Sequence, residues 1–157
     1  MFAAPPRRMA DLDINLVLVP VDGSDESREA VEFALAIADK YDASVHAVYV
    51  LGEEIVRGIE TGAVDETDIA DDTRSFTTEI ATIAADTEVP LTSSIAYGFS
   101  QKVKTVHPGS VVLDTAEELD SDFIVVPREP MADDPSDVLE KAAEYVLLYA
   151  SQPVLSV

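Results

Sequence analysis

The chain alternates short apolar runs with longer stretches of helical periodicity, and the apolar runs predict the strands of a sheet. Three of them are continuous, as strands buried on both faces of a parallel sheet are. They are residues 16–21, 45–51 and 123–126. Pro20 has no N–H to donate, so we place it near the carboxyl end of the first strand. Residues 91–97 alternate instead between two sets of side chains, which predicts a half-exposed edge strand.

Apolar residues at helical spacing separate these strands and predict helices between them. The helical segments are residues 30–41, residues 65–86, a helix from Pro108 to Leu119, and a helix that starts at Asp134-Pro135 and ends near Ala150. Residues 52–62 have the composition of a loop, and the final residues 153–157 form a short strand.

Strands and helices therefore alternate along the whole chain. This order predicts the α/β fold class: an open five-stranded, mostly parallel sheet with right-handed crossovers and helices on both faces. We expect a flexible N-terminal tail over residues 1–13 and a single domain over residues 14–157.

Composition limits the chemistry that the chain can perform. It has 157 residues, 47% of them hydrophobic, and no cysteine, which excludes disulfides and thiolate metal sites. His46 and His107 are the only histidines, so we expect no zinc site. No apolar run approaches the roughly 18–20 residues of a membrane span. The Arg7-Arg8 pair has no apolar segment after it, so we expect a cytoplasmic protein that does not enter membranes.

Charge is the most unusual property of the composition. Asp and Glu total 31 against 10 Lys and Arg, a formal net charge of −21. Acids spread along a chain with an ordinary apolar content favour a halophilic protein, because dense salt screens self-repulsion. The alternative is an acidic protein with a cationic partner. No basic stripe exists that would neutralise phosphates, so we expect no nucleic acid partner.

The segment after the strand at 123–126 begins like a phosphate site and then departs from one. Glycines normally follow such a strand, so that backbone N–H groups can approach the anion. Here Pro127 and Pro130 occupy the turn, and neither has an N–H. At the end of the first strand, Asp22-Gly23-Ser24 is turn chemistry, and Ser24 is a candidate helix cap.

Four segments in this order resemble the universal stress protein family, over roughly residues 14–157. They are Val19-Pro20-Val21-Asp22-Gly23-Ser24, the helix from Glu29 to Asp39, Thr115 to Val126, and Gln152-Pro153-Val154-Leu155-Ser156-Val157. The resemblance implies a flavodoxin-like (adenine nucleotide α hydrolase-like) sheet. It also implies a homodimer through the C-terminal strand and, in many members, ATP binding.

ATP-binding members of the family are similar in a G-x-x-G-x(9)-G-[ST] signature after the fourth strand. The signature positions hold Pro127, Pro130, Glu140 and Lys141 in this chain. Each lost charge-assisted hydrogen bond costs about 1.5–3 kcal/mol, whereas a micromolar site represents only about 8 kcal/mol. Glu140 places a negative charge where the negatively charged triphosphate would lie, and Lys141 offsets this charge in part. We therefore expect a degenerate site without a bound cofactor, the alternative being ATP or another adenine nucleotide.

The same resemblance indicates which residues would form a residual crevice. Asp22 matches the family aspartate after the first strand, and Val50 matches the residue whose backbone faces adenine. The candidate binding residues are Pro20, Asp22, Val50, Arg128 and Lys141. The competing hypothesis is that Asp22-Gly23-Ser24 only turns the chain and caps a helix.

Other polar groups have weaker claims to chemistry. Ser24, His46 and Asp22 have the residue types of a hydrolytic triad, but no nucleophile elbow surrounds the serine. His107 precedes Pro108 and is interpreted as a helix-start residue. Asp68, Asp71 and Asp72 lack calcium-loop spacing and are expected on a solvated helix face.

The polar stretch from Phe99 to Val106 carries Lys102 and Lys104 and is followed by His107. It is interpreted either as a surface insertion or as a docking site for an acidic partner.

These observations favour a non-catalytic, dimeric regulatory or protective module with a degenerate nucleotide site and a protein partner that the sequence does not name. The alternative is a nucleotide or small-molecule binder that uses the same crevice. A slow ATPase has little support, because the site lacks donors for the phosphate charge that develops during the reaction.

Overall fold

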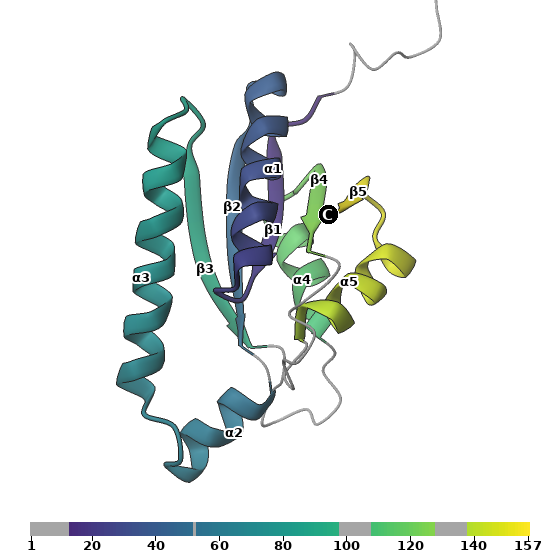
Figure 1. The fold of residues 1–157 in the computed structure, drawn as a ribbon. Helices are drawn as coiled ribbons and strands as arrows, with labels where there is room; N and C mark the ends of the chain where they lie inside the picture. The colour runs from purple at the N-terminus through teal and green to yellow at the C-terminus, as the bar shows by residue number, and fades with distance from the viewer. Residues whose placement is uncertain (1–12, 52, 98–107, 128–137) are drawn as a thin grey trace, which may run out of the picture.

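Five parallel strands form one sheet in the computed structural model, which describes residues 13–51, 53–97, 108–127 and 138–157 (Figure 1). The strands are β1 (Leu16–Val21), β2 (Ser44–Leu51), β3 (Leu91–Tyr97), β4 (Phe123–Val126) and β5 (Val154–Ser156). Their order across the sheet is β3-β2-β1-β4-β5, and each neighbouring pair is parallel. The α/β prediction is confirmed, and β3 is an edge strand of this sheet as its alternation indicated.

Helices cover both faces of the sheet, as predicted. They are α1 (Asp25–Tyr41), α2 (Glu53–Thr61), α3 (Glu66–Ala85), α4 (Pro108–Glu118) and α5 (Val138–Tyr149). In Figure 1, α1 and α3 lie on one side of the strands, and α4 and α5 lie on the other. None of the described helices is long and apolar enough to cross a membrane.

The sheet divides the hydrophobic core into two clusters because successive side chains of a strand point to opposite faces. In β1, Val17 and Val19 pack with α1 and α3, whereas Leu18 packs with α4 and α5. In β2, Ala47 belongs to the first cluster and Val48 to the second. The sequence of such a strand is a continuous apolar run because both of its faces are buried.

The prediction of a loop over residues 52–62 is wrong, because residues 53–61 form α2. Gly58 concealed the helix, since glycine is a poor helix former. Glycine is needed at this position because Val64 packs against its Cα, where a side chain would collide. Gly62, with φ +81°, ends the helix. That terminal glycine was the sequence signal for the helix.

The predicted boundaries of the next helix are correct to within one residue. α3 starts after Asp65, whose side chain caps it by accepting a 2.8 Å hydrogen bond from the N–H of Thr67. α5 is described from Val138 onward, so its predicted start at Asp134-Pro135 lies outside the described residues. The same holds for residues 1–12 of the predicted tail.

Asp122 fixes the start of the central strand. Its Oδ2 accepts hydrogen bonds from the backbone N–H groups of Asn15, at 2.8 Å, and Leu16, at 3.1 Å. Asn15 precedes β1 and Leu16 is its first residue, so a carboxylate more than a hundred positions away in the chain satisfies the first donors of this strand. This contact aligns β4 with β1 at the end of the sheet opposite the candidate site.

Candidate functional site

The carboxyl ends of β1 and β4 form the topological switch point of the sheet. The chain leaves β1 toward β2 on one side, whereas β4 lies on the other side of β1. Open α/β sheets bind ligands in the crevice at this point. Asp22 follows β1, Val50 lies near the end of β2, and Pro127 follows β4. The sequence prediction therefore selected positions at one edge of the sheet.

Strand register places Asp22 beside Val50. The last recorded pair between β1 and β2 is Val21↔Tyr49, so the next position along each strand is Asp22 and Val50. Val50 and Pro20 are buried, and Asp22 is half-buried. Pro20 is the second-last residue of β1 and lies beyond the two recorded pairs between β1 and β4, so its missing N–H interrupts neither of them.

The remaining predicted site residues are described in part or not at all. Lys141 lies near the start of α5, but the position of its side chain is not described. Arg128 and Pro130 lie outside the described residues, as do Lys102, Lys104 and His107.

Local hydrogen bonds account for the Asp22-Gly23-Ser24 turn. Asp22 Oδ1 accepts from the N–H of Ser24 at 3.0 Å, and Ser24 Oγ accepts from the N–H of Ser27 at 3.2 Å. Ser24 is the N-cap of α1, and Gly23 has φ +88°. These contacts are those of the turn-and-cap hypothesis. They engage one oxygen of the carboxylate that an adenine site would use.

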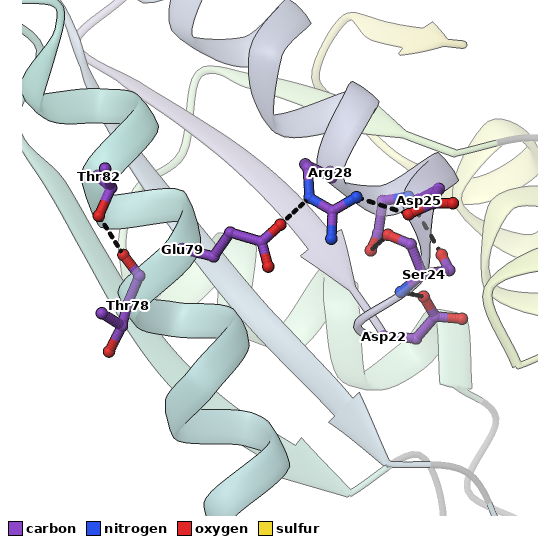
Figure 2. A network of polar contacts seen from close by, with 8 residues as sticks. Asp22, Ser24, Asp25, Arg28, Thr78, Glu79 and Thr82 are labelled. Atoms are coloured by element: carbon purple, nitrogen blue, oxygen red, sulfur yellow. Dashed lines mark hydrogen bonds and ion pairs between the residues drawn. The ribbon is translucent and has the colours of Figure 1, made fainter.

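Two carboxylates from different elements hold Arg28 at the start of α1 (Figure 2). Its guanidinium lies 2.5 Å from Asp25 on the same helix and also pairs with Glu79 of α3. The hydrogen bond to Asp25, and then that to Glu79, raise the pKa of Arg28 above its ordinary value. The pairs are partly exposed, so we assign them at most about 1 kcal/mol each. The pair with Glu79 connects α1 to α3.

Tyr49 closes the turn from the side of β2, which the sequence analysis did not foresee. Its hydroxyl donates to the carbonyl of Asp22 at 3.1 Å, and its ring meets Phe76 edge-on at a centroid distance of 5.9 Å. Burial, followed by the charges of Asp22 and Asp72, raises the pKa of Tyr49. Tyr49 therefore remains a neutral hydrogen-bond donor that supports the backbone of the turn after β1.

His46 belongs to a second polar cluster, away from this crevice. Its Nδ1 lies 2.7 Å from Thr92 Oγ1, and its Nε2 lies 2.8 Å from Ser94 Oγ. Both hydroxyls come from β3, on the sheet face that carries α4. Burial lowers the pKa of His46. Ser24 caps α1 on the opposite face, so Ser24, His46 and Asp22 do not form a triad.

Asp68, Asp71 and Asp72 lie exposed on α3, as expected. Asp71 accepts a 3.1 Å hydrogen bond from Arg74 one turn later. Within the described part of the chain, no group of three or more His, Cys, Asp or Glu is arranged to hold a metal ion.

The fold defines a class of protein: a single five-stranded parallel α/β sheet with helices on both faces and a topological switch point between β1 and β4. Within that class, the chain belongs to the universal stress protein family, whose sequence model matches residues 14–157. The resemblance stated from the sequence is confirmed.

Individual relatives agree with this family assignment. A universal stress protein of Methanocaldococcus jannaschii is 26% identical over 145 residues, which are 90% of this chain and 80% of the relative. The structure of an Archaeoglobus fulgidus universal stress protein in complex with dAMP has a TM-score of 0.63 at 19% identity, over 92% of this chain and 98% of that chain. A universal stress protein in complex with cAMP has a TM-score of 0.59 at 20% identity, over 93% of this chain and 98% of the other. At these identities the structural likeness establishes the fold.

Proposed function

We propose that this chain is a non-catalytic regulatory or protective module of the stress response whose nucleotide site does not hold a triphosphate. The observation that carries the proposal is Pro127. It is buried at the end of β4, at the position where the ATP-binding signature of the family begins with a glycine. Family membership supports the stress-related role.

The chemistry of the crevice supports the loss of phosphate binding. A phosphate beside a parallel strand end is held chiefly by backbone N–H groups. Proline at 127 and 130 removes two such donors, and Glu140 replaces a glycine with a carboxylate near the start of α5. Without these donors, about 1.5–3 kcal/mol each, little of a micromolar affinity remains.

The same deficit supports a module without catalytic activity. Phosphoryl transfer is accelerated by donors preorganised around the developing charge. The described part of the crevice offers buried apolar side chains, Pro127 and a carboxylate already bonded to its own turn. Its output would then be binding to a protein partner in the cytoplasm.

A second candidate function is recognition of an adenine nucleotide with few phosphates. Relatives of this fold form complexes with dAMP and cAMP, which supports this alternative. Asp22 and Val50 would contact the nucleoside, and Arg128 and Lys141 would neutralise a single phosphate. This ligand needs fewer backbone donors than ATP does.

Titration calorimetry in molar KCl tests the two candidates. We expect no heat with ATP and Mg²⁺, and restored ATP binding in a Pro127→Gly/Pro130→Gly variant. Micromolar ATP binding by the unmodified chain would overturn the proposal. Binding of dAMP that is lost in Asp22→Ala would favour the second candidate.

We also propose that the module is a homodimer that pairs through β5. This three-residue strand is half-buried at the sheet edge, and the end of α5 nearby exposes Leu148 and Tyr149, by 75% and 64%. Because the N–H of Ile124 donates to Pro153 O and alternate residues face alternate sides, Val154 and Ser156 direct their backbone groups away from β4.

Val154→Pro removes one of these outward donors and leaves the bonds to β4. We expect it to shift the protein from dimer to monomer in sedimentation analysis in high salt. Val154→Thr, which keeps the N–H, is the matched control. An unmodified chain that sediments as a monomer at all concentrations would contradict the dimer.

A further inference from the structure

The outer edge of β3 is an unprotected strand edge in the described part of the sheet. All seven residues of β3 pair with β2, and no described strand pairs with its other side. In Figure 1 it lies at the border of the sheet, next to α3. Proteins usually protect such edges with Lys, Pro, bulges or very short strands. Leu91–Tyr97 has none of these features.

Parallel pairing determines which backbone groups of β3 are available. The N–H of Val45 donates to Pro90 O, which directs the backbone groups of Pro90, Thr92, Ser94 and Ala96 toward β2. The groups of Leu91, Ser93 and Ile95 therefore point outward. The side chain of Ile95 is 53% exposed.

Two grooves of different chemistry flank this edge. On the α4 face, His46 and Ser94 form the floor of a groove of about 400 Å³, and Asp114 and Glu118 line it from α4. Both carboxylates are exposed and lie four residues apart on one helix face. On the α3 face, a groove of about 480 Å³ is lined mostly by small and polar side chains, including Thr73, Thr77 and Ile95, and by Arg74, which pairs with Asp71.

We propose that the β3 edge binds a basic extended peptide segment of a partner protein by strand addition. Side chains of an added strand alternate between the faces of a sheet. Every second residue would reach the groove with Asp114 and Glu118, where Lys or Arg is complementary. The intervening residues would reach the groove with Thr73 and Ile95, which accepts Val, Thr or another small side chain.

Charge identifies the partner as basic rather than as a second copy. Asp114 and Glu118 line the groove beside this edge, so pairing two β3 edges would bring these carboxylates of both copies together. A lysine-bearing segment gains an attraction there instead. The site lies on the opposite edge of the sheet from β5, and its proposed contacts are with β3, α3 and α4 rather than with Asp22 or Pro127. It can therefore be tested separately from the proposed function.

Peptide binding to the full chain tests this proposal. The probe is a short labelled peptide that alternates Lys and Val, measured in molar KCl, where the Debye length of ~3 Å suppresses diffuse attraction to an acidic surface. We expect saturable binding. An analogue with alternate backbone nitrogens methylated has the same charge but cannot add as a strand, and we expect its affinity to be at least about tenfold lower.

Matched variants separate the groove from general acidity. Asp114→Asn/Glu118→Gln should weaken binding about tenfold. Glu117→Gln removes a neighbouring exposed carboxylate of α4 that does not line the groove, and it should leave affinity unchanged. Circular dichroism confirms that each variant is folded, which is expected because all three side chains are exposed.

Amide hydrogen exchange gives the position of the peptide. Added peptide should slow exchange at Ser93 and Ile95, and leave Ser94, already bonded to β2, unchanged. Absence of binding, equal affinity for the methylated peptide, or equal loss in Glu117→Gln would overturn the proposal. So would protection at Val154 and Ser156 instead, or protection of Ser93 and Ile95 in the protein alone.

Discussion

Gly23 combines two constraints in the turn that leads from β1 to the crevice. Its φ of +88° is a conformation that side chains disfavour, and a Cβ at this position would lie 2.6 Å from the Tyr49 hydroxyl. That hydroxyl is not free to move away, because it donates to Asp22 O and the ring packs on Phe76. Gly62 has a similar φ, of +81°, with no atom within 4 Å of a Cβ. The two positions therefore separate backbone strain from steric contact.

We expect Gly62→Ala to lower the free energy of unfolding by about 1 kcal/mol and Gly23→Ala by about 2–3 kcal/mol, since only the second displaces a packed ring. Urea denaturation in KCl measures both. Adding Tyr49→Phe to Gly23→Ala should recover part of the loss. Equal losses at the two glycines would show that Tyr49 exerts no constraint.

His46 predicts a pH dependence of stability. Burial lowers its pKa in the folded protein below the ordinary 6.5, so the unfolded chain binds a proton more readily. The contribution of His46 to the free energy of unfolding is therefore fully present above pH 6.5. It is lost as the pH falls from 6.5 toward the lower pKa of the folded protein, with a limiting slope of about 1.4 kcal/mol per pH unit. His46→Gln should reduce the difference in unfolding free energy between neutral and mildly acidic solutions. A variant with the unmodified pH profile would assign the dependence to other groups.

At the scale of the elements, pattern alone predicted most of the fold. The strands 16–21 and 123–126 have the predicted bounds because a strand buried on both faces is continuously apolar. α2 was missed because Gly58 breaks its helical pattern. Glycine occupies this position because a side chain there would collide with Val64. Helix propensity, which is assigned residue by residue, carries no information about such a contact.

The candidate site was predictable only where it coincides with strand ends. The family resemblance indicated Asp22 and Val50, and the structure places Asp22 just after β1 and Val50 near the end of β2. The bonds of Tyr49 to Asp22, and of His46 to Thr92 and Ser94, depend on register between strands. Register is not readable from one strand at a time.

Asp122 gives an element-level prediction, because it satisfies the first backbone donors of the central strand. Asp122→Ala removes an acceptor from two N–H groups at once, and water replaces it only in part. We expect a loss of about 2 kcal/mol in unfolding free energy. Asp122→Asn keeps an amide oxygen and should lose less. Indistinguishable alanine and asparagine variants would contradict the role of the acceptor.

At the scale of the whole molecule, net charge is the dominant property. A charge of −21 on 157 residues repels itself, and the Debye length falls from about 10 Å at 0.1 M to about 3 Å at 1 M salt. We expect the melting temperature to rise between these KCl concentrations. Sucrose, which stabilises folded proteins without screening charge, is the control. If sucrose raised the melting temperature but KCl left it unchanged, the result would contradict a role for self-repulsion.

The position of β1 at the centre of the sheet has a consequence for synthesis on the ribosome. Its pairing partner β2 follows after a single helix, whereas β4, on its other side, is made only after α2, α3, β3 and α4. At about 5–20 residues per second, this leaves one side of an apolar strand without its partner for several seconds. We expect nascent chains that end before residue 123 to depend on chaperones, and chains that extend beyond it to be released from them.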